Sequence, residues 1–301
     1  MSLNYIYDIV IKDKKGGIIM QIWVIYTIIH AIFAGFFQCS KKKSSEINSI
    51  YEVLAAFSLI SFFMAAFTST NNFNIELQNI LLIALKSLII VVAWLLGIYS
   101  MTKMPISLYS VINLSRIIFS IILSVIFLGE KLTLTIITGA IIIIIGLILV
   151  NKVSQKDDDK EVELKIVLLL LFSCFLNSVA SVIDKVVTKY VTATQLQFWF
   201  LFFLALFFWL IILARRKKLE IQKLKKNYWI LVAAVSLVVG DRFLFMANAN
   251  PDSKVAIMTL LKQISVIEGI ILGKIIFKEK NIVKKMLCSI LIIFGILLTI
   301  I

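Results

Sequence analysis

Long apolar runs separated by short polar segments make up almost the whole chain. Ten of these runs reach roughly 20 residues, the length that an α-helix needs to cross the hydrocarbon core of a bilayer. The pattern therefore predicts an all-α integral membrane protein with ten transmembrane helices. We expect these helices at residues 18–40, 47–69, 78–101, 105–127, 132–151, 165–188, 195–214, 227–248, 253–275 and 283–301.

Composition and charge agree with this pattern. The 301 residues are 61% hydrophobic, with a mean hydropathy of +1.02, whereas soluble domains are about 45–50% apolar. The net charge of +14 comes from basic residues between the apolar runs, where they orient helices and contact anionic lipid head groups. We therefore expect membrane lipids, and not nucleic acid, as partners of this charge. The cysteines, Cys39, Cys174 and Cys288, lack metal-ligand spacing and are interpreted as packing residues.

Two segments, one in each half of the chain, look like copies of each other. MPISLYSVINLSR and NPDSKVAIMTLLK align without a gap, so that Pro105 meets Pro251 and Arg116 meets Lys262. These are the only two prolines in the chain, and similar FLGEK and IFKEK segments follow the two copies. Many secondary transporters are built from duplicated apolar units of this kind.

The duplication predicts how the chain is divided. A charged linker, residues 153–164, separates a first repeat at 18–152 from a second at 165–301, and a mixed tail covers residues 1–17. Each repeat holds five predicted spans. Because five is an odd number, the second repeat must enter the membrane in the opposite orientation, which predicts two inverted five-helix repeats.

The order of these motifs resembles the EamA-like branch of the drug/metabolite transporter superfamily over nearly the whole chain. FLGEKL followed by GAIIIIIGLILV is similar to the end of an EamA repeat, and FKEK followed by IIFGILL is similar to the end of the second. SVIDK, GDRFLF and TLLKQIS also resemble second-repeat positions. The resemblance implies ten helices, two inverted repeats, a central substrate cavity and termini in the cytoplasm. The predicted location is a bacterial cytoplasmic membrane.

The basic residues give a different orientation. Most Lys and Arg residues lie in the predicted loops opposite the termini, including Lys41, Lys42, Lys43 and the segment 215–226. The positive-inside rule places such loops in the cytoplasm, and both termini then lie outside. The two orientations stay open as alternatives.

Ionisable residues inside the spans are the first candidates for function, because each costs about 2.5–3.5 kcal/mol to insert and so faces a cavity or a partner. Arg116 and Lys262 lie about twelve residues into their predicted helices, near the membrane midplane. We expect them to bind the substrate. The alternative is that each forms an internal ion pair with Asp184, Asp241 or Glu268 and only holds helices together.

Small residues follow each of the two cations. Ser120 and Ser124 follow Arg116 at intervals of four, and after a three-residue offset in the alignment Gly269 and Gly273 occupy the matching positions in the second half. Such stripes allow helices to approach closely and place the cations on an inward face. Two further lysines, Lys185 and Lys274, lie near helix ends, where we expect their ammonium groups to reach toward the interface.

Two sets of candidate site residues result from this reasoning. The predicted substrate-binding residues are Arg116, Lys262, Lys86, Trp94, Tyr99, Asn113, Asn177 and Gln263. The predicted ion- or proton-coupling residues are Asp184, Asp241, Glu268 and His30. A structural role is the alternative for each carboxylate and for the histidine. No metal site is predicted, because a lone histidine cannot make one.

The charge of the predicted interior indicates the substrate class. Lys86, Arg116, Arg242 and Lys262 outnumber the carboxylates Asp184, Asp241 and Glu268, which favours a substrate with an anionic group, such as an amino acid or an organic acid. The chain has no GxxxxGK[ST] loop and no HExxH motif, so we predict no enzyme activity and no cofactor. Transport would then use a gradient. The alternative is a membrane scaffold or sensor that keeps the transporter fold, and a homodimer is left open.

Overall fold

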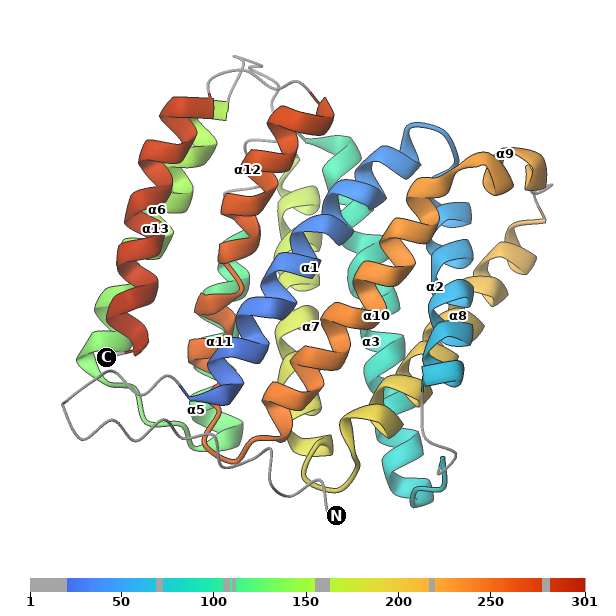
Figure 1. Cartoon of the computed structure of the whole chain (residues 1–301), viewed down its shortest axis with the longest axis horizontal. Coiled ribbons are helices and arrows are strands. Elements are labelled where there is room, and N and C mark those ends of the chain that lie inside the picture. The colour runs from blue at the N-terminus through green and yellow to red at the C-terminus, as the bar shows by residue number, and fades with distance from the viewer. Residues whose placement is uncertain are drawn as a thin grey trace.

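The computed structural model describes residues 21–68, 73–104, 109, 112–154, 163–216, 220–277 and 282–300. These residues form helices joined by short connections, with no strand among them (Figure 1). The helices are α1 (Ile22–Ser45), α2 (Ile50–Thr68), α3 (Leu77–Lys103), α5 (Ser115–Leu128), α6 (Leu134–Ser154), α7 (Leu164–Val187), α8 (Ala193–Arg215), α9 (Ile221–Lys226), α10 (Tyr228–Ala249), α11 (Val255–Leu261), α12 (Ile264–Phe277) and α13 (Ile282–Ile300).

Seven segments of the described chain are long and apolar enough to cross a membrane. They are α1, α2, α3, α7, α8, α10 and the combined segment of α11 and α12. Two shorter apolar helices, Ser115–Leu128 and Leu134–Val150, accompany them. The chain is therefore an all-helical, multi-pass membrane protein.

The span that we expected over residues 253–275 corresponds to one apolar segment, Val255–Ile276, but its helix is broken into two. α11 ends at Leu261, and α12 begins at Ile264 after a turn at Lys262 and Gln263. Within this turn the Gln263 N–H donates to the Leu260 carbonyl, a spacing of three residues and not four. The Lys262 carbonyl accepts both from the Ser265 hydroxyl at 2.7 Å and from the Ser265 backbone N–H at 3.1 Å, so the carbonyl at the break is satisfied locally.

The expected helix over 105–127 is described only from its second part onward. Residues 105–108 and 110–111, with the first proline of the duplicated motif, lie outside the described residues. α5 starts at Ser115, directly after a turn at Leu114. The Ile117 N–H donates to the Leu114 carbonyl at 2.9 Å, again a spacing of three. Leu114 and Ile117 align with Leu260 and Gln263, so the two halves make the same three-residue hydrogen bond at matching positions.

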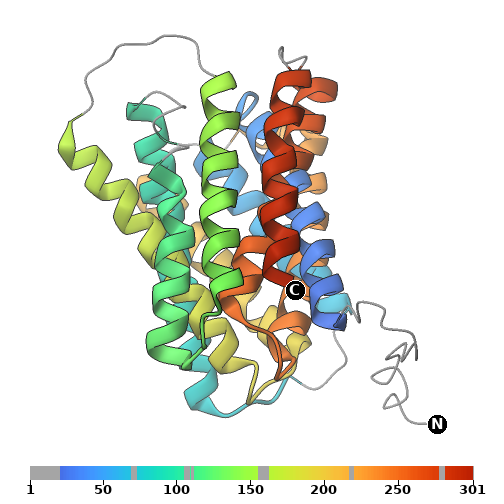
Figure 2. The same cartoon turned by 90° about the vertical axis from the view of Figure 1, so that its left-hand side faces the viewer.

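Helices from the two halves pack against each other in pairs. α1 runs along α10, α2 along α8, α3 along α7, and α6 along α13. Figure 1 and Figure 2 both show α6 and α13 side by side at one edge of the molecule. A Cβ added at Gly139 or at Gly295 would overlap the backbone carbonyl of the other glycine, so the α6–α13 contact requires both.

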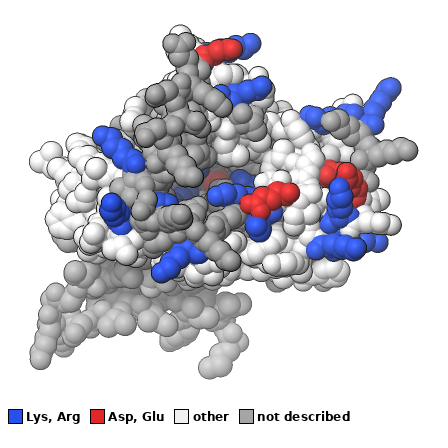
Figure 3. All heavy atoms as spheres, turned by 90° about the horizontal axis from the view of Figure 1, so that it is seen from above, with Lys and Arg blue, Asp and Glu red and all other residues white. Residues whose placement is uncertain are grey.

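Basic side chains gather on one face of the molecule. α1 begins and α13 ends at the lower side of Figure 1, and Figure 3 shows the opposite face, where Lys and Arg predominate. Lys41–Lys43 at the end of α1 and Lys223, Lys225 and Lys226 of α9 lie at this end of the bundle. The basic residues are thus concentrated on the face away from the start of α1 and the end of α13.

Candidate functional site

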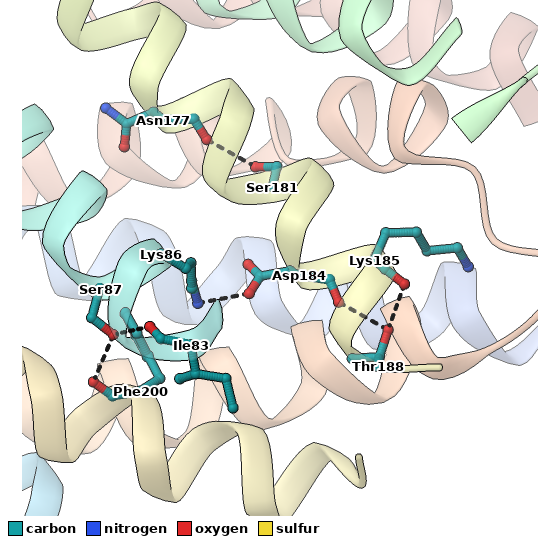
Figure 4. Close-up of polar contacts among 9 residues, drawn as sticks. All are labelled: Ile83, Lys86, Ser87, Asn177, Ser181, Asp184, Lys185, Thr188 and Phe200. Carbon is teal, nitrogen blue, oxygen red and sulfur yellow. Dashed lines mark hydrogen bonds and ion pairs between the residues drawn. The ribbon is translucent and has the colours of Figure 1, made fainter. Parts of the chain in front are cut away.

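A buried ion pair connects the two halves. The Lys86 ammonium of α3 lies 2.7 Å from a carboxylate oxygen of Asp184 on α7 (Figure 4), and the side chains are only 3% and 8% exposed. The ammonium also lies over the rings of Phe200 and Phe245, at 3.5 and 4.7 Å from their centroids. Both charges are thus compensated by each other, and the pair fixes α3 to α7.

Arg116 and Lys262 have different surroundings. No hydrogen bond or ion pair within the described part of the chain engages the Arg116 guanidinium or the Lys262 ammonium. Both residues are partly exposed. They lie within electrostatic range of each other, and Lys262 is also within range of Asp184 and Asp241. Two cations therefore converge from aligned positions of the two halves, and neither forms an ion pair with a residue that the structure describes.

The backbone at Arg116 is held firmly although its charged end is not. The Ser178 hydroxyl of α7 donates to the Arg116 carbonyl at 3.1 Å. One turn further along α5, the Ser120 hydroxyl donates to the Ser178 hydroxyl at 3.0 Å. These bonds hold α5 against α7 and fix the position from which the guanidinium extends.

His30 and Asp241 complete the cluster around the two cations. The His30 Nδ1–H donates to the Gly240 carbonyl at 3.0 Å, and His30 lies within electrostatic range of Arg116 and Lys262. Asp241 follows Gly240 on α10, is partly exposed and lies within range of Lys262. We call Arg116, Lys262, Asp241 and His30 the polar centre.

The side chains of Asp241 and Arg242 point in different directions, because adjacent residues on a helix diverge by about 100°. Arg242 Nε donates to the side-chain oxygen of Gln197 on α8, and its guanidinium also donates to the Thr68 hydroxyl of α2 at 3.3 Å. Arg242 is therefore a tie between α10, α8 and α2. Its guanidinium is thus engaged by α8 and α2, and we do not count Arg242 among the charges of the candidate site.

The two aromatic candidates do not share a face of α3. They are five residues apart, about 140° around a helix. The Trp94 ring packs with the rings of Phe37, Phe57 and Phe208, with centroid distances of 5.9–6.2 Å. Tyr99 is 48% exposed. The two rings therefore lie on different faces of α3, and their role in substrate binding stays a prediction.

The three amide candidates each use one polar atom for the fold. Asn113 Oδ1 accepts from Cys174 Sγ at 3.4 Å, Asn177 Nδ2 donates to the Ser173 carbonyl at 2.8 Å, and Gln263 Nε2 donates to the Thr259 carbonyl at 3.0 Å. Each amide keeps its other polar atom without a bond to the described residues. Figure 4 shows Asn177 on α7, two turns before Asp184 on the same helix.

Glu268 lies one turn into α12, where both of its carboxylate oxygens are buried and lack a hydrogen-bond partner in the described chain. The neighbouring Gly269 does not make the close helix contact that the small-residue pattern predicted. A Cβ added at Gly269 would have no atom within 4 Å, because this side of α12 faces open space. The prediction was wrong because spacing alone does not show which small residue meets another helix.

Lys185 does not reach toward the interface as we expected. It is buried, and its ammonium donates to the carbonyls of Asn248 and Asn250 and to the Ser253 hydroxyl, at 2.9, 2.6 and 2.6 Å. The connection between α10 and α11 covers the end of α7 and directs these acceptors at the lysine. The expectation failed because it considered the position of Lys185 in its own helix only.

Glu130 was not identified as a site residue from the sequence. Its carboxylate, in the connection between α5 and α6, accepts from the backbone N–H groups of Val255 and Ala256 at the start of α11. It therefore caps a helix of the other half. The signal that could have revealed it is the Glu that recurs in FLGEK and IFKEK. We call Glu130 and Lys185, with the bonds they make, the termini-side clamp.

One cavity among the described residues is apolar. It has a volume of about 230 Å³ and lies between α5, α6 and α7. Its lining is Ile112, Leu114, Ser115, Ile118, Ile144, Ile148, Val167 and Leu171. A charged group would find no counter-charge there. In the same part of the chain, no three His, Cys, Asp or Glu side chains cluster in a way that could hold a metal ion.

Comparison with known proteins gives the family. The sequence profile of the EamA-like transporter family matches residues 21–152 and, a second time, residues 164–301. A protein of known crystal structure is similar in fold, with a TM-score of 0.73 at 12% sequence identity, over 91% of this chain and 96% of that chain. A search of curated proteins gave no match. The two profile matches cover nearly the whole chain, which therefore belongs to the EamA-like transporter family.

Proposed function

We propose that the protein is a secondary transporter that moves a small metabolite with an anionic group, such as an amino acid or an organic anion, across a bacterial cytoplasmic membrane. Family membership supports transport of small molecules. The observation that carries the substrate class is the pair of cations, Arg116 and Lys262, which lie inside the membrane-spanning bundle and form no ion pair with the described residues. Charges at this depth are retained where they face a partner or a pathway.

The chemistry of the polar centre matches such a substrate. A guanidinium binds a carboxylate with two parallel hydrogen bonds, and an ammonium adds a compact positive charge. Lys262 also lies in the turn between two helix segments, and broken helices of this kind form the binding sites of many carriers. Asp241 offers a carboxylate to the ammonium group of an amino acid. An organic anion without an amine would not use it.

The same proposal includes ten spans in two inverted repeats, 18–152 and 165–301, joined by the charged linker 153–164. The seven long segments, together with α5, α6 and α13, supply the ten helices. The matched three-residue hydrogen bonds, from the Ile117 N–H to the Leu114 carbonyl and from the Gln263 N–H to the Leu260 carbonyl, support the repeat.

Transport proceeds by alternating access driven by a solute or ion gradient. Within the termini-side clamp, the Glu130 cap joins the two halves at one end of the bundle, and Lys185 holds the connection between α10 and α11 against α7 inside the second half. Access from that side requires these bonds to break. A clamp of about five hydrogen bonds is a barrier that binding of substrate can offset, because each contributes about 0.5–1.5 kcal/mol net.

Uptake by purified protein in proteoliposomes tests the proposal. A pool of amino acids, organic acids, nucleosides and amines is offered under imposed pH and voltage gradients, and the lumen is analysed by mass spectrometry. We expect accumulation of a compound with an anionic group, and loss of that accumulation in Lys262→Ala. Lys43→Ala is the matched control, because Lys43 forms a surface pair with Glu46.

Two results would contradict the proposal. An empty lumen with folded protein under every gradient would favour the scaffold or sensor. Normal uptake by Lys262→Ala would show that the protein is a transporter whose substrate site does not include Lys262.

A further inference from the structure

One carboxyl group of the bundle differs from all others that the structure describes inside the spans. Glu268 of α12 has both carboxylate oxygens buried, with no donor from any described residue. Asp184, in contrast, is paired with Lys86, and Asp241 lies within range of Lys86 and Lys262. Among the described residues, Glu268 thus has neither a hydrogen-bond donor nor a nearby cation to stabilise a negative charge.

The group lies in a notch made by a glycine of α1. A Cβ added at Gly35 would overlap the Glu268 carboxylate, so a larger residue at position 35 would displace this carboxylate from its place. Gly35 lies in the middle of α1, a 24-residue helix, and is itself buried. The contact between α1 and α12 is therefore shaped around this carboxyl group.

The described helices packed against α12 place no hydrogen-bond donor on the Glu268 carboxylate. The titratable groups of α1 and α13 are Tyr26, His30, Cys39, Lys41, Lys42, Lys43, Lys284, Lys285 and Cys288. None of them forms a hydrogen bond or ion pair with Glu268. Among the described residues, no charged group lies close enough to stabilise the Glu268 carboxylate, so burial alone acts on its negative charge.

An ionised carboxylate in such surroundings is strongly disfavoured, because it has lost water without gaining a counter-charge. A neutral carboxylic acid avoids this cost. We propose that Glu268 is the proton-binding site of this carrier, protonated while α12 is packed against α1 and ionised when the two helices separate. The O–H bond breaks with transfer of the proton to water on one side, and the carboxylate takes a proton from water on the other.

The notch and the polar centre share one mobile element. α12 begins at Ile264, two residues after Lys262, so a movement of α12 away from α1 displaces the turn that carries this cation. Protonation of Glu268 and binding of an anion at Lys262 then act on the same helix. Thermodynamic linkage requires each to change the affinity for the other by the same factor. This coupling rests on the proposed transport function, whereas the proton site itself does not.

A hydrophobic carbodiimide tests the proton site without any transport. Dicyclohexylcarbodiimide adds to protonated carboxyl groups in apolar surroundings, and peptide mass spectrometry locates the product. We expect labelling at Glu268 that decreases as pH rises, with no labelling at Glu130, whose carboxylate is bonded to two backbone N–H groups. Gly35→Ala should reduce labelling, because it displaces the carboxyl from the notch.

Absence of labelling at Glu268 at every pH, in folded protein, would overturn the proton site. Glu268→Gln checks the assignment, because it must remove the labelled peptide. This result is independent of uptake, so an empty lumen in the transport assay would not be confused with it.

Coupling is tested by comparing two modes of transport in Glu268→Gln. We expect accumulation driven by a pH gradient to decrease by at least about tenfold, while exchange of labelled for unlabelled substrate at equal pH continues. The exchange assay shows that the variant is folded and binds substrate. Accumulation equal to that of the unmodified protein would overturn the coupling role.

Discussion

Two lysines of the same membrane interior, Lys86 and Lys262, have opposite surroundings. Lys86 is 3% exposed, paired with Asp184 and covered by two phenylalanine rings. Lys262 lies in a turn between two helices, partly exposed and without a bonded partner in the described chain. The difference shows that depth in the membrane does not by itself make a charge functional. What matters is whether the fold already supplies its counter-charge.

The largest expected effect comes from breaking the paired site. Asp184→Asn leaves Lys86 buried without a counter-charge, which should destabilise the protein by about 3–5 kcal/mol. Thermal unfolding followed with a thiol-reactive dye measures this, because Cys39 and Cys174 are buried in the folded state. The double variant Lys86→Met/Asp184→Leu should recover most of the loss. A single variant as stable as the unmodified protein would show that the pair does not hold α3 to α7.

A smaller loss of stability should distinguish Gly295, which lies in a close helix contact, from Gly269, which does not. Gly295→Ala places a methyl group against the Gly139 carbonyl, and overpacking of this kind costs about 1–3 kcal/mol. Gly269→Ala places the same methyl group in open space and should leave the unfolding temperature unchanged. Equal effects of the two substitutions would contradict the close contact between α6 and α13.

The polar centre should respond in selectivity more than in stability. Asp241→Asn should weaken binding of an amino acid by roughly tenfold, because hydrogen bonds to charged groups contribute about 1.5–3 kcal/mol. Binding of an organic anion without an amine should change little. Competition between the two substrate classes in the uptake assay measures the ratio. An equal loss for both classes would mean that Asp241 acts on the cations and not on the substrate.

The termini-side clamp should give the smallest change in stability. Glu130→Gln removes the charge that caps α11 and should cost about 1 kcal/mol, as does loss of other helix caps. Glu46→Gln is the control, since Glu46 pairs with Lys43 at the surface. Identical unfolding curves for the two variants would show that the cap does not join the halves.

Much of the helical framework could be predicted from the sequence. The run expected at 78–101 is α3, Leu77–Lys103, and that expected at 165–188 is α7, Leu164–Val187. Apolar length determines these boundaries, because a helix in lipid must satisfy its own backbone. The break at Lys262 could not be predicted in the same way. Apolar residues continue on both sides of it, so hydropathy does not change where the hydrogen bonding does.

The candidate site was predictable as a set of charges but not as a set of contacts. Arg116, Lys262 and Asp241 were identified from their depth in the spans. The pairing of Lys86 with Asp184 joins residues about a hundred positions apart in different halves, and so does the cap that Glu130 places on α11. Such partners depend on how the repeats interleave, and a sequence pattern gives no register between two helices that are distant in the chain.

The most direct test of the difference between the two lysines is a comparison of Lys86→Met with Lys262→Met, in which stability and uptake are measured on the same preparations. Methionine keeps much of the apolar stem and removes the charge. We predict that Lys86→Met unfolds at a markedly lower temperature, whereas Lys262→Met unfolds like the unmodified protein and no longer accumulates substrate. Normal accumulation by Lys262→Met, or an equal loss of stability in both variants, would contradict the distinction between a structural and a substrate-binding cation.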